Sequence, residues 1–161
     1  MKLTNSLARI ALVVVGVSLM GLTAAAQETK VTAKDVPAAV ISAFKSAYPT
    51  ATIKGYAREK EHGKTFYEIE SKDGDTGRDI LYHSDGSVAE VEETVAASDL
   101  PATAQDLIHS KYPGAMVTKA ERTTEKTVQG DKISYEVVAR QGKKRFTLEF
   151  DADGKLKRKA K

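Results

Sequence analysis

The sequence predicts an α+β fold: a tandem repeat of αββββ units that forms one antiparallel eight-stranded sheet with two helices on one face. Three observations support this prediction. The segment DVPAAVISAFKSAYP at residues 35–49 recurs as DLPATAQDLIHSKYP at residues 99–113. Each copy is followed by short segments in which apolar and polar residues alternate, as they do in half-buried strands. A Tyr-Glu pair and an Asp-Gly turn then recur in both copies, which indicates that the whole unit is duplicated.

Residues 1–26 predict a signal peptide for export. The basic residues Lys2 and Arg9 precede an uncharged apolar stretch at 10–22, and three alanines ending at Ala26 form a small-residue cleavage site. The apolar stretch is shorter than the roughly 20 residues that span a bilayer, so an uncleaved membrane anchor is the weaker alternative. We expect a periplasmic or secreted protein, cleaved near Ala26, that is not an integral membrane protein.

Residues 27–34 are polar and have no periodic pattern, so they are predicted to be a flexible lead-in. A helix follows in each copy, because Pro37 suits a first turn and the Tyr-Pro dipeptide ends the helical stretch. One apolar stripe recurs at helical spacing in the first copy and is mirrored in the second: Val40, Ala43, Phe44 and Ala47, then Ala104, Leu107, Ile108 and Lys111. We expect this face of each helix to be buried against the sheet.

Four strands are predicted after each helix. Tyr67 and Ile69 alternate with Glu68 and Glu70, so the tyrosine, with its counterpart Tyr135, is expected in the core and the glutamates on the opposite face. One helix over four strands makes a thin core, which favours a single domain that both copies share. The predicted strands lie near residues 52–59, 65–71, 78–83 and 87–95, then 116–125, 132–140, 144–150 and 156–158, within one domain (35–161) of two repeats, 35–98 and 99–161.

These recurring motifs resemble those of a known family. A helix entered through Val-Pro or Leu-Pro and left through Tyr-Pro, then strands with a Tyr-Glu pair and an Asp-Gly turn, twice over in a small exported protein, resembles the PepSY-like family of periplasmic proteins. That family is related in fold to the β-lactamase inhibitor protein. The resemblance implies a helix-plus-four-strand repeat and a non-catalytic protein that works by binding or inhibition. It transfers no functional residue, because Pro37, Tyr48, Pro49 and Asp85 are all explained as determinants of the fold.

The residue types that catalysis and metal binding require are absent or scattered. The three histidines, His62, His83 and His109, fall in a turn, at a strand end and on a helix, and the chain has no cysteine. Asp and Gly cluster at residues 73–79, but Gly77 stands where an EF-hand needs its third oxygen ligand. We therefore predict no enzyme activity, no metal and no cofactor.

Charge is distributed unevenly between the two copies. Residues 35–98 hold 7 basic and 12 acidic residues, whereas residues 99–161 hold 14 and 9, so the copies carry about −5 and +5. The basic C-terminus either protects an edge strand from aggregation or contacts an anionic surface or acidic partner. Export argues against nucleic acid as that partner. The basic residues concerned are Lys155, Lys157, Arg158, Lys159 and Lys161.

The sheet face without a helix is the candidate binding surface, because it must meet either water or a partner. We expect the partner to be an unidentified protein or peptide of the cell envelope. The alternative is a carrier or sensor that holds a small ligand between helices and sheet, which requires a cavity of several hundred cubic ångströms. The residues predicted for the binding face are Phe66, Glu68, Glu70, Leu81, Glu136 and Glu149.

Overall fold

A computed structural model describes residues 27–61 and 63–160, in which one sheet carries two α-helices on one of its faces. The predicted signal peptide lies outside the described residues. The strands are β1 (Gln27–Lys30), β2 (Thr52–Glu61), β3 (Lys64–Asp73), β4 (Thr76–His83), β5 (Val88–Thr94), β6 (Met116–Thr127), β7 (Gly130–Gln141), β8 (Lys144–Asp151) and β9 (Leu156–Ala160). The helices are α1 (Ala38–Ala47) and α2 (Ala102–Lys111), each preceded by a short 3-10 helix, η1 (Ala33–Asp35) or η2 (Ala97–Asp99).

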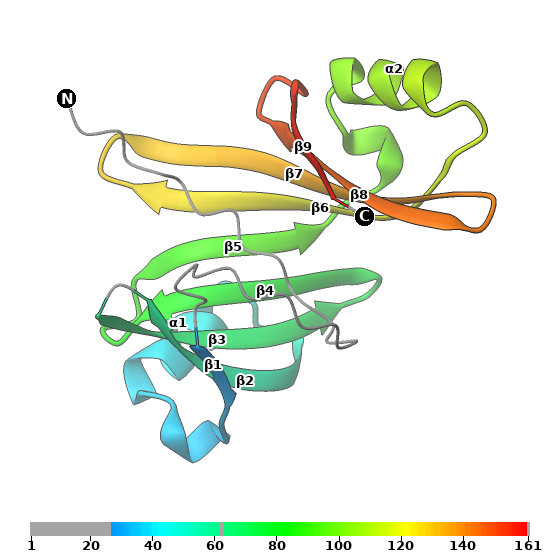
Figure 1. Cartoon of the computed structure of the whole chain (residues 1–161). Helices are drawn as coiled ribbons and strands as arrows, with labels where there is room; N and C mark the ends of the chain where they lie inside the picture. The colour runs from blue at the N-terminus through cyan, green and yellow to red at the C-terminus, as the bar shows by residue number, and fades with distance from the viewer. Residues whose placement is uncertain (1–26, 62, 161) are drawn as a thin grey trace.

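The nine strands of the described chain lie side by side in chain order, and all neighbours are antiparallel. The predicted α+β repeat is therefore confirmed, with β5 and β6 joining the two copies in the middle of the sheet. Figure 1 shows α1 beside β2–β4 at one end of the molecule and α2 beside the strands of the second copy at the other.

The sheet has one more strand than predicted, because residues 27–34 are not a purely flexible lead-in. Residues Gln27–Lys30 pair with β2, where Lys30 is opposite Ala57. The segment contains no apolar residue that could reveal a period, and its pairing depends on backbone hydrogen bonds, so the sequence pattern gave no signal. Asp35 then closes η1 by accepting hydrogen bonds from the backbone N and the Oγ1 of Thr32, at 3.0 and 2.6 Å.

Each helix buries the centre of the stripe that the sequence predicts, whereas Ala47 and Lys111 at the C-terminal ends of the two stripes are exposed. Val40 and Phe44 are 0% and 1% exposed, and Ala104 and Ile108 occupy the same places in the second copy. The register shows that both stripes meet one face of the sheet, because cross-strand partners point to the same side. The continuous row that establishes this is Ile69, Ile80, Val91, Thr124 and Ile133, from β3 to β7. We call the opposite side the helix-free face.

The predicted strand alternation is correct, although the most buried aromatic residues differ from those expected. Tyr67 and Tyr135 lie on the helix-bearing face but are only partly buried at the edges of the two cores. Their cross-strand partners, Tyr82 and Phe150, are 1% and 0% exposed and lie deeper. The helices are only ten residues long, so each covers the middle of its half of the sheet rather than the whole width of that half.

Replacing Tyr82 with phenylalanine is expected to stabilise the protein by about 1 kcal/mol. The hydroxyl of Tyr82 is buried and has no hydrogen-bond partner, and burial raises its pKa to about 12. An unsatisfied buried polar group costs about 1–3 kcal/mol, which the phenylalanine ring avoids at nearly constant shape. Thermal and urea denaturation would measure the change, and a loss of stability in Tyr82→Phe would mean that the hydroxyl is bonded in solution.

Both Asp-Gly turns pack against the start of a helix. Gly86 follows β4 at φ +88°, and a Cβ built on it would lie 2.8 Å from the carbonyl oxygen of Ala39 in α1. Gly154 repeats the arrangement in the second copy at φ +78°, where a Cβ would lie 2.8 Å from the backbone nitrogen of Ala104. The turns recur in the sequence because only glycine fits both the backbone angle and the space.

Candidate binding face

The six residues predicted for the binding face lie on the helix-free face. Glu68 is opposite Leu81 across β3 and β4, and Glu136 is opposite Glu149 across β7 and β8. Phe66 and Glu70 are two residues from Glu68 along β3, so they point to the same side. Because Glu90 of β5 is opposite Glu125 of β6, the same face continues from the first copy into the second.

Two of these residues are less accessible than predicted. Phe66 is 9% exposed and Leu81 is 4% exposed, so neither stands on the surface as an open apolar contact. The ring of Phe66 packs against His83, with their centroids 5.0 Å apart. Sequence alternation assigns a residue to a face but does not report how far longer neighbouring side chains cover it. Carboxylates make up much of the rest of the helix-free face, and three of them, Glu59, Glu90 and Glu121, are themselves only 8–9% exposed.

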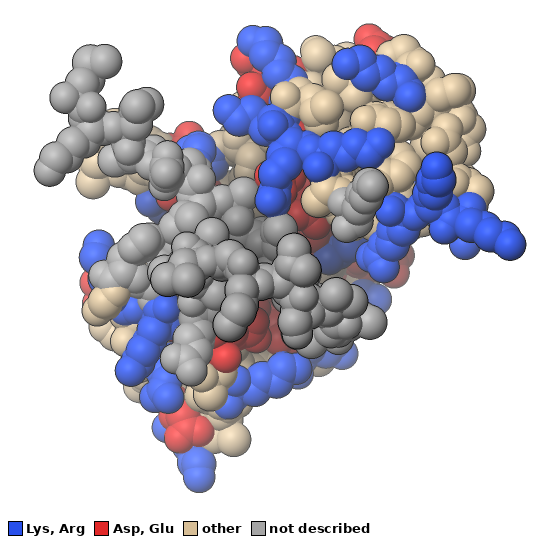
Figure 2. Space-filling view, in the orientation of Figure 1, with Lys and Arg blue, Asp and Glu red and all other residues tan. Residues whose placement is uncertain are grey.

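The pairing register aligns these carboxylates in two rows. Row 1 consists of Glu70 on β3, Asp79 on β4 and Glu92 on β5, each directly opposite the next. Row 2 consists of Glu121 on β6, Glu136 on β7 and Glu149 on β8. The six predicted binding-face residues did not include Asp79, Glu92 or Glu121. Glu92 joins row 1 through the register of β4 with β5, and Glu121 joins row 2 through the register of β6 with β7. In the view of Figure 2, Lys and Arg side chains surround much of the molecular outline, and Asp and Glu side chains are visible between them.

Burial and mutual repulsion make several of these groups reluctant to ionise. Burial, with the charges of Glu70 and Glu121 nearby, raises the pKa of Asp79 to about 6. Burial also raises the pKa of Glu92 to about 8. Burial and, as a smaller contribution, a hydrogen bond with Glu59 raise the pKa of Glu68 to about 9. The pKa of Glu136 is raised as well, by burial and by the neighbouring glutamates of row 2. The helix-free face therefore carries less negative charge at neutral pH than its composition suggests.

The raised pKa values predict that the protein is more stable in mild acid than in mild base. A carboxyl group whose pKa is higher in the folded state keeps its proton there while the unfolded chain loses it, so the free energy of unfolding falls as pH rises between about 4.5 and 9. The melting temperature should be higher at about pH 5 than at about pH 9. Glu92→Gln should flatten this dependence, and a melting temperature that rises with pH would show that these groups are solvated.

The predicted basic surface at the C-terminus is partly used within the chain. Arg158 of β9 donates hydrogen bonds from Nε, at 2.8 Å, and from Nη2 to Oε1 of Glu149. The ammonium group of Lys159 lies 4.3 Å from the ring centroid of Tyr112, and Lys155 forms a 3.3 Å ion pair with Asp153. These contacts favour a structural role for the edge strand, and Lys161 lies outside the described residues.

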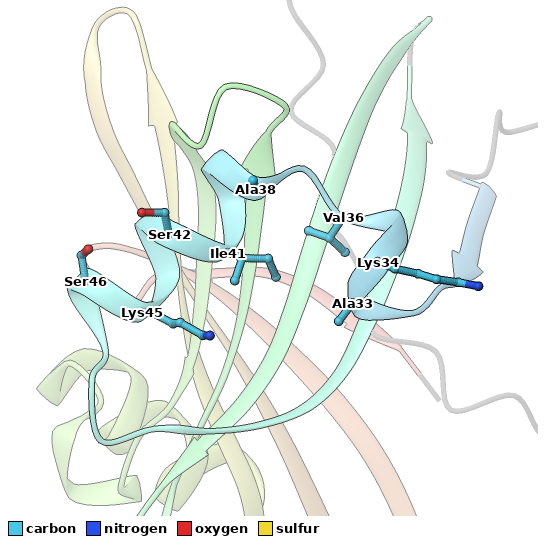
Figure 3. Close-up of a pocket in the computed structure, with 8 residues that line it drawn as sticks. All are labelled: Ala33, Lys34, Val36, Ala38, Ile41, Ser42, Lys45 and Ser46. Atoms are coloured by element: carbon cyan, nitrogen blue, oxygen red, sulfur yellow. The ribbon is translucent and has the colours of Figure 1, made fainter.

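Two hollows on the surface bear on the alternative of a small-ligand carrier. The first has a volume of about 600 Å³ and is shown in Figure 3, where Val36 and Ile41 face it and Lys34 and Lys45 extend at its sides. All of its lining residues lie between Ala33 and Ser46, so no strand forms part of it. It is an open groove between η1 and α1 rather than a cavity between helix and sheet.

The second hollow, of about 660 Å³, lies on the helix-bearing face near the junction of the two copies. Glu93, Arg122 and Tyr135 line it together with Asp99 of η2, but no residue of α1 or α2 does. Glu93 links Arg78 and Arg122 there, accepting at 2.7 and 2.8 Å from their side-chain nitrogens. This hollow is therefore polar, and two of its charged residues, Glu93 and Arg122, already bind one another.

The described residues offer no assembly of three or more His, Asp or Glu side chains placed to hold a metal ion. His83 and His109 lie on β4 and α2, at separate places in the fold, and His62 is outside the described residues. Within the described part of the chain, no helix is long and apolar enough to cross a membrane.

Comparison with known proteins places this fold among characterised structures. A family model described as beta-lactamase-inhibitor-like, PepSY-like matches residues 23–90 and, in a second overlapping match, residues 67–158. A BLIP-like protein from Bacteroides fragilis is 20% identical with a TM-score of 0.54, and the match covers 77% of this chain and 84% of that one. No curated protein matches significantly.

Two further solved structures have the same fold. A DUF2874 family protein from Bacteroides uniformis is 16% identical with a TM-score of 0.58, over 77% of this chain and 88% of that one. A candidate periplasmic protein from Bacteroides eggerthii is 14% identical with a TM-score of 0.60, over 77% and 87% of the two chains. At these identities the similarity shows the fold alone.

Proposed function

Because this chain belongs to the PepSY-like family, we propose that it is a non-catalytic binding protein that contacts a protein of the cell envelope through the helix-free face of its sheet. The observation that carries the proposal is the extent of that face. It runs without interruption across both copies, whereas both α-helices cover the other side. A sheet needs only one apolar face to fold, so the second is available for recognition.

Three points support the location and the class. The signal peptide predicted from residues 1–26 would direct the chain to the envelope, and a solved relative of the same fold is named as a candidate periplasmic protein. The family description reads beta-lactamase-inhibitor-like, which favours a protein that binds another protein. The described residues place His83 and His109 on separate elements, β4 and α2, and offer no group of three His, Asp or Glu side chains that could hold a metal ion.

Site-specific photo-crosslinking in cells tests which face binds. A crosslinking amino acid replaces either Glu136 or Thr147 on the helix-free face, or Lys45 or Asp106 on the helices as matched exposed controls. We expect a discrete crosslinked partner from the two sheet positions and none from the two helix positions. Crosslinks confined to the helices would contradict the proposal and move attention to the groove beside α1.

A further inference from the structure

The two rows of carboxylates place like charges next to one another on neighbouring strands. Directly opposite side chains in an antiparallel sheet have Cβ atoms about 4.5–5.5 Å apart, and like charges at that spacing destabilise the pairing. The helix-free face contains two such rows, each with three carboxylates on successive strands. Such an arrangement departs from the alternation of charge that a purely structural surface favours, and departures of this kind concentrate at functional sites.

Row 2 receives its cations from the chain itself. Arg158 stands on β9 directly opposite Glu149, at the end of the row, and its guanidinium donates two hydrogen bonds to that carboxylate. At the other end, the ammonium group of Lys119 lies 2.6 Å from Oε1 of Glu121. The structure thus contains an example of the contact that this face makes with a basic strand lying alongside it.

Row 1 ends differently. The residue opposite Glu70 on the next strand, β2, is Gly55. A Cβ built on Gly55 would lie 2.9 Å from Oε2 of Glu70, so the carboxylate lies directly over the glycine. Among the described residues, the ion pairs that the basic side chains form do not include Glu70, Asp79 or Glu92. The position next to row 1 on β2 is therefore a glycine, whereas the position next to row 2 on β9 is Arg158.

We propose that the protein partner is basic, and that it places an arginine or lysine side chain over Gly55 against the row of Glu70, Asp79 and Glu92. This inference rests on the proposed function and names the chemistry of the partner. The bound guanidinium or ammonium group repeats the contact of Arg158 with Glu149. Without the predicted signal peptide, which carries Lys2 and Arg9, the chain has a formal net charge of only +1. The net charge therefore does not attract a basic partner, and the attraction must come from the carboxylates of row 1.

Proton release accompanies this binding. Because burial and neighbouring carboxylates raise the pKa values of Asp79 and Glu92, part of row 1 holds protons at neutral pH. A cation favours the ionised form, so it binds more tightly as pH rises and expels these protons. The charged groups that act on the two carboxyls from the surrounding strands are Glu28, Glu70, Glu90, Glu121 and Glu136, with Lys119 as the opposing cation.

Titration calorimetry with a defined peptide tests the proposal on the full-length protein. The probe is an acetylated twelve-residue peptide of alternating arginine and serine, and its glutamate-serine counterpart is the control peptide. Gly55→Arg places a cation beside row 1 within the chain and should weaken binding about tenfold or more, because the site is then occupied. Gly55→Gln adds a side chain of similar reach without charge and should weaken binding clearly less than Gly55→Arg does.

Affinity for the arginine peptide should also rise between about pH 6.5 and pH 9 and fall with added salt. Equal losses in Gly55→Arg and Gly55→Gln would overturn the proposal in favour of simple steric blocking. No binding to the unmodified protein would overturn it as well. Crosslinking from Glu136 together with a negative peptide result would leave the proposed function standing with a partner of different chemistry. Crosslinks from the helix positions alone, together with weaker peptide binding by Gly55→Arg, would contradict the proposed function but keep row 1 as a site for basic peptides.

A second set of variants covers the case in which Gly55→Arg does not fold. The triple variant Glu70→Gln, Asp79→Asn and Glu92→Gln neutralises row 1 without adding bulk, and it should abolish peptide binding. Asp75→Asn, Asp106→Asn and Asp131→Asn together change the formal net charge by the same amount at other exposed positions, and this control should bind like the unmodified protein. Equal binding by both triple variants would contradict the assignment of row 1.

Discussion

Phe44→Ala is expected to destabilise the protein by about 3–5 kcal/mol, enough to unfold much of a marginally stable population at 37 °C. The ring is 1% exposed, and it packs within the first core beside Val40, Ile69 and Ile80. It also contacts Tyr48, with ring centroids 5.5 Å apart. Truncation leaves a cavity beneath the only α-helix that covers the first copy among the described residues, so little else can fill the space.

Urea denaturation monitored by circular dichroism measures this loss, and Lys45→Ala on the exposed side of the same helix is the matched control, expected to stay within about 0.5 kcal/mol. Because β5 pairs with β6, we also expect one unfolding transition for both copies. A variant in which residues 99–161 keep their own transition while residues 35–98 unfold would show two independent domains instead.

Gly86→Ala should have the second-largest effect, a loss of about 3 kcal/mol. Two costs combine at this position. A non-glycine residue at φ +88° is strained by about 1–2 kcal/mol, and its Cβ would lie 2.8 Å from the carbonyl oxygen of Ala39, which is backbone and cannot rotate away. Either the turn or the start of α1 must move, and both are fixed by the packing of the first core.

Gly142→Ala separates the two costs. Gly142 has a φ of +60°, but a Cβ there meets nothing within 4 Å, so only the strain of about 1 kcal/mol applies. Gly154→Ala should resemble Gly86→Ala, because its Cβ would approach Ala104 in the second copy just as closely. Equal melting temperatures for Gly86→Ala and Gly142→Ala would show that the close contact with α1 is absent in solution.

The sequence predicted the fold well wherever side-chain periodicity reports burial. An apolar residue at every second position marks a half-buried strand, because alternate side chains point to the same face. This pattern placed Tyr67, Ile69, Ile80 and Tyr82 on one face, as the strand register shows. The repeated Asp-Gly turn was visible because a backbone constraint selects one residue type. Strand β1 was not visible, since residues 27–30 pair through their backbone at an edge and bury no apolar side chain that would leave a pattern.

The candidate site was predicted less completely, because its rows of carboxylates depend on how the strands pair with one another. Glu68 and Glu136 were placed on the correct face by alternation within single strands. The rows of carboxylates depend on which residue stands opposite which, and Glu92 joins Asp79 only through the register of β4 with β5. Cross-strand register is set by turn lengths and bulges along the whole sheet, so no local window of sequence contains it.

The order of the strands has a consequence for how the protein folds. Every strand pairs with the strands that precede and follow it in the chain. Most pairings close a turn of a few residues and lose little chain entropy, whereas β1–β2 and β5–β6 close a connection that contains a helix. A chain that emerges with its N-terminus first can add one hairpin at a time to a growing sheet, and no strand must wait for a distant partner. Topologies of this kind fold quickly for β-rich proteins, and the duplication lengthens the sheet without slowing the closure of any single pair.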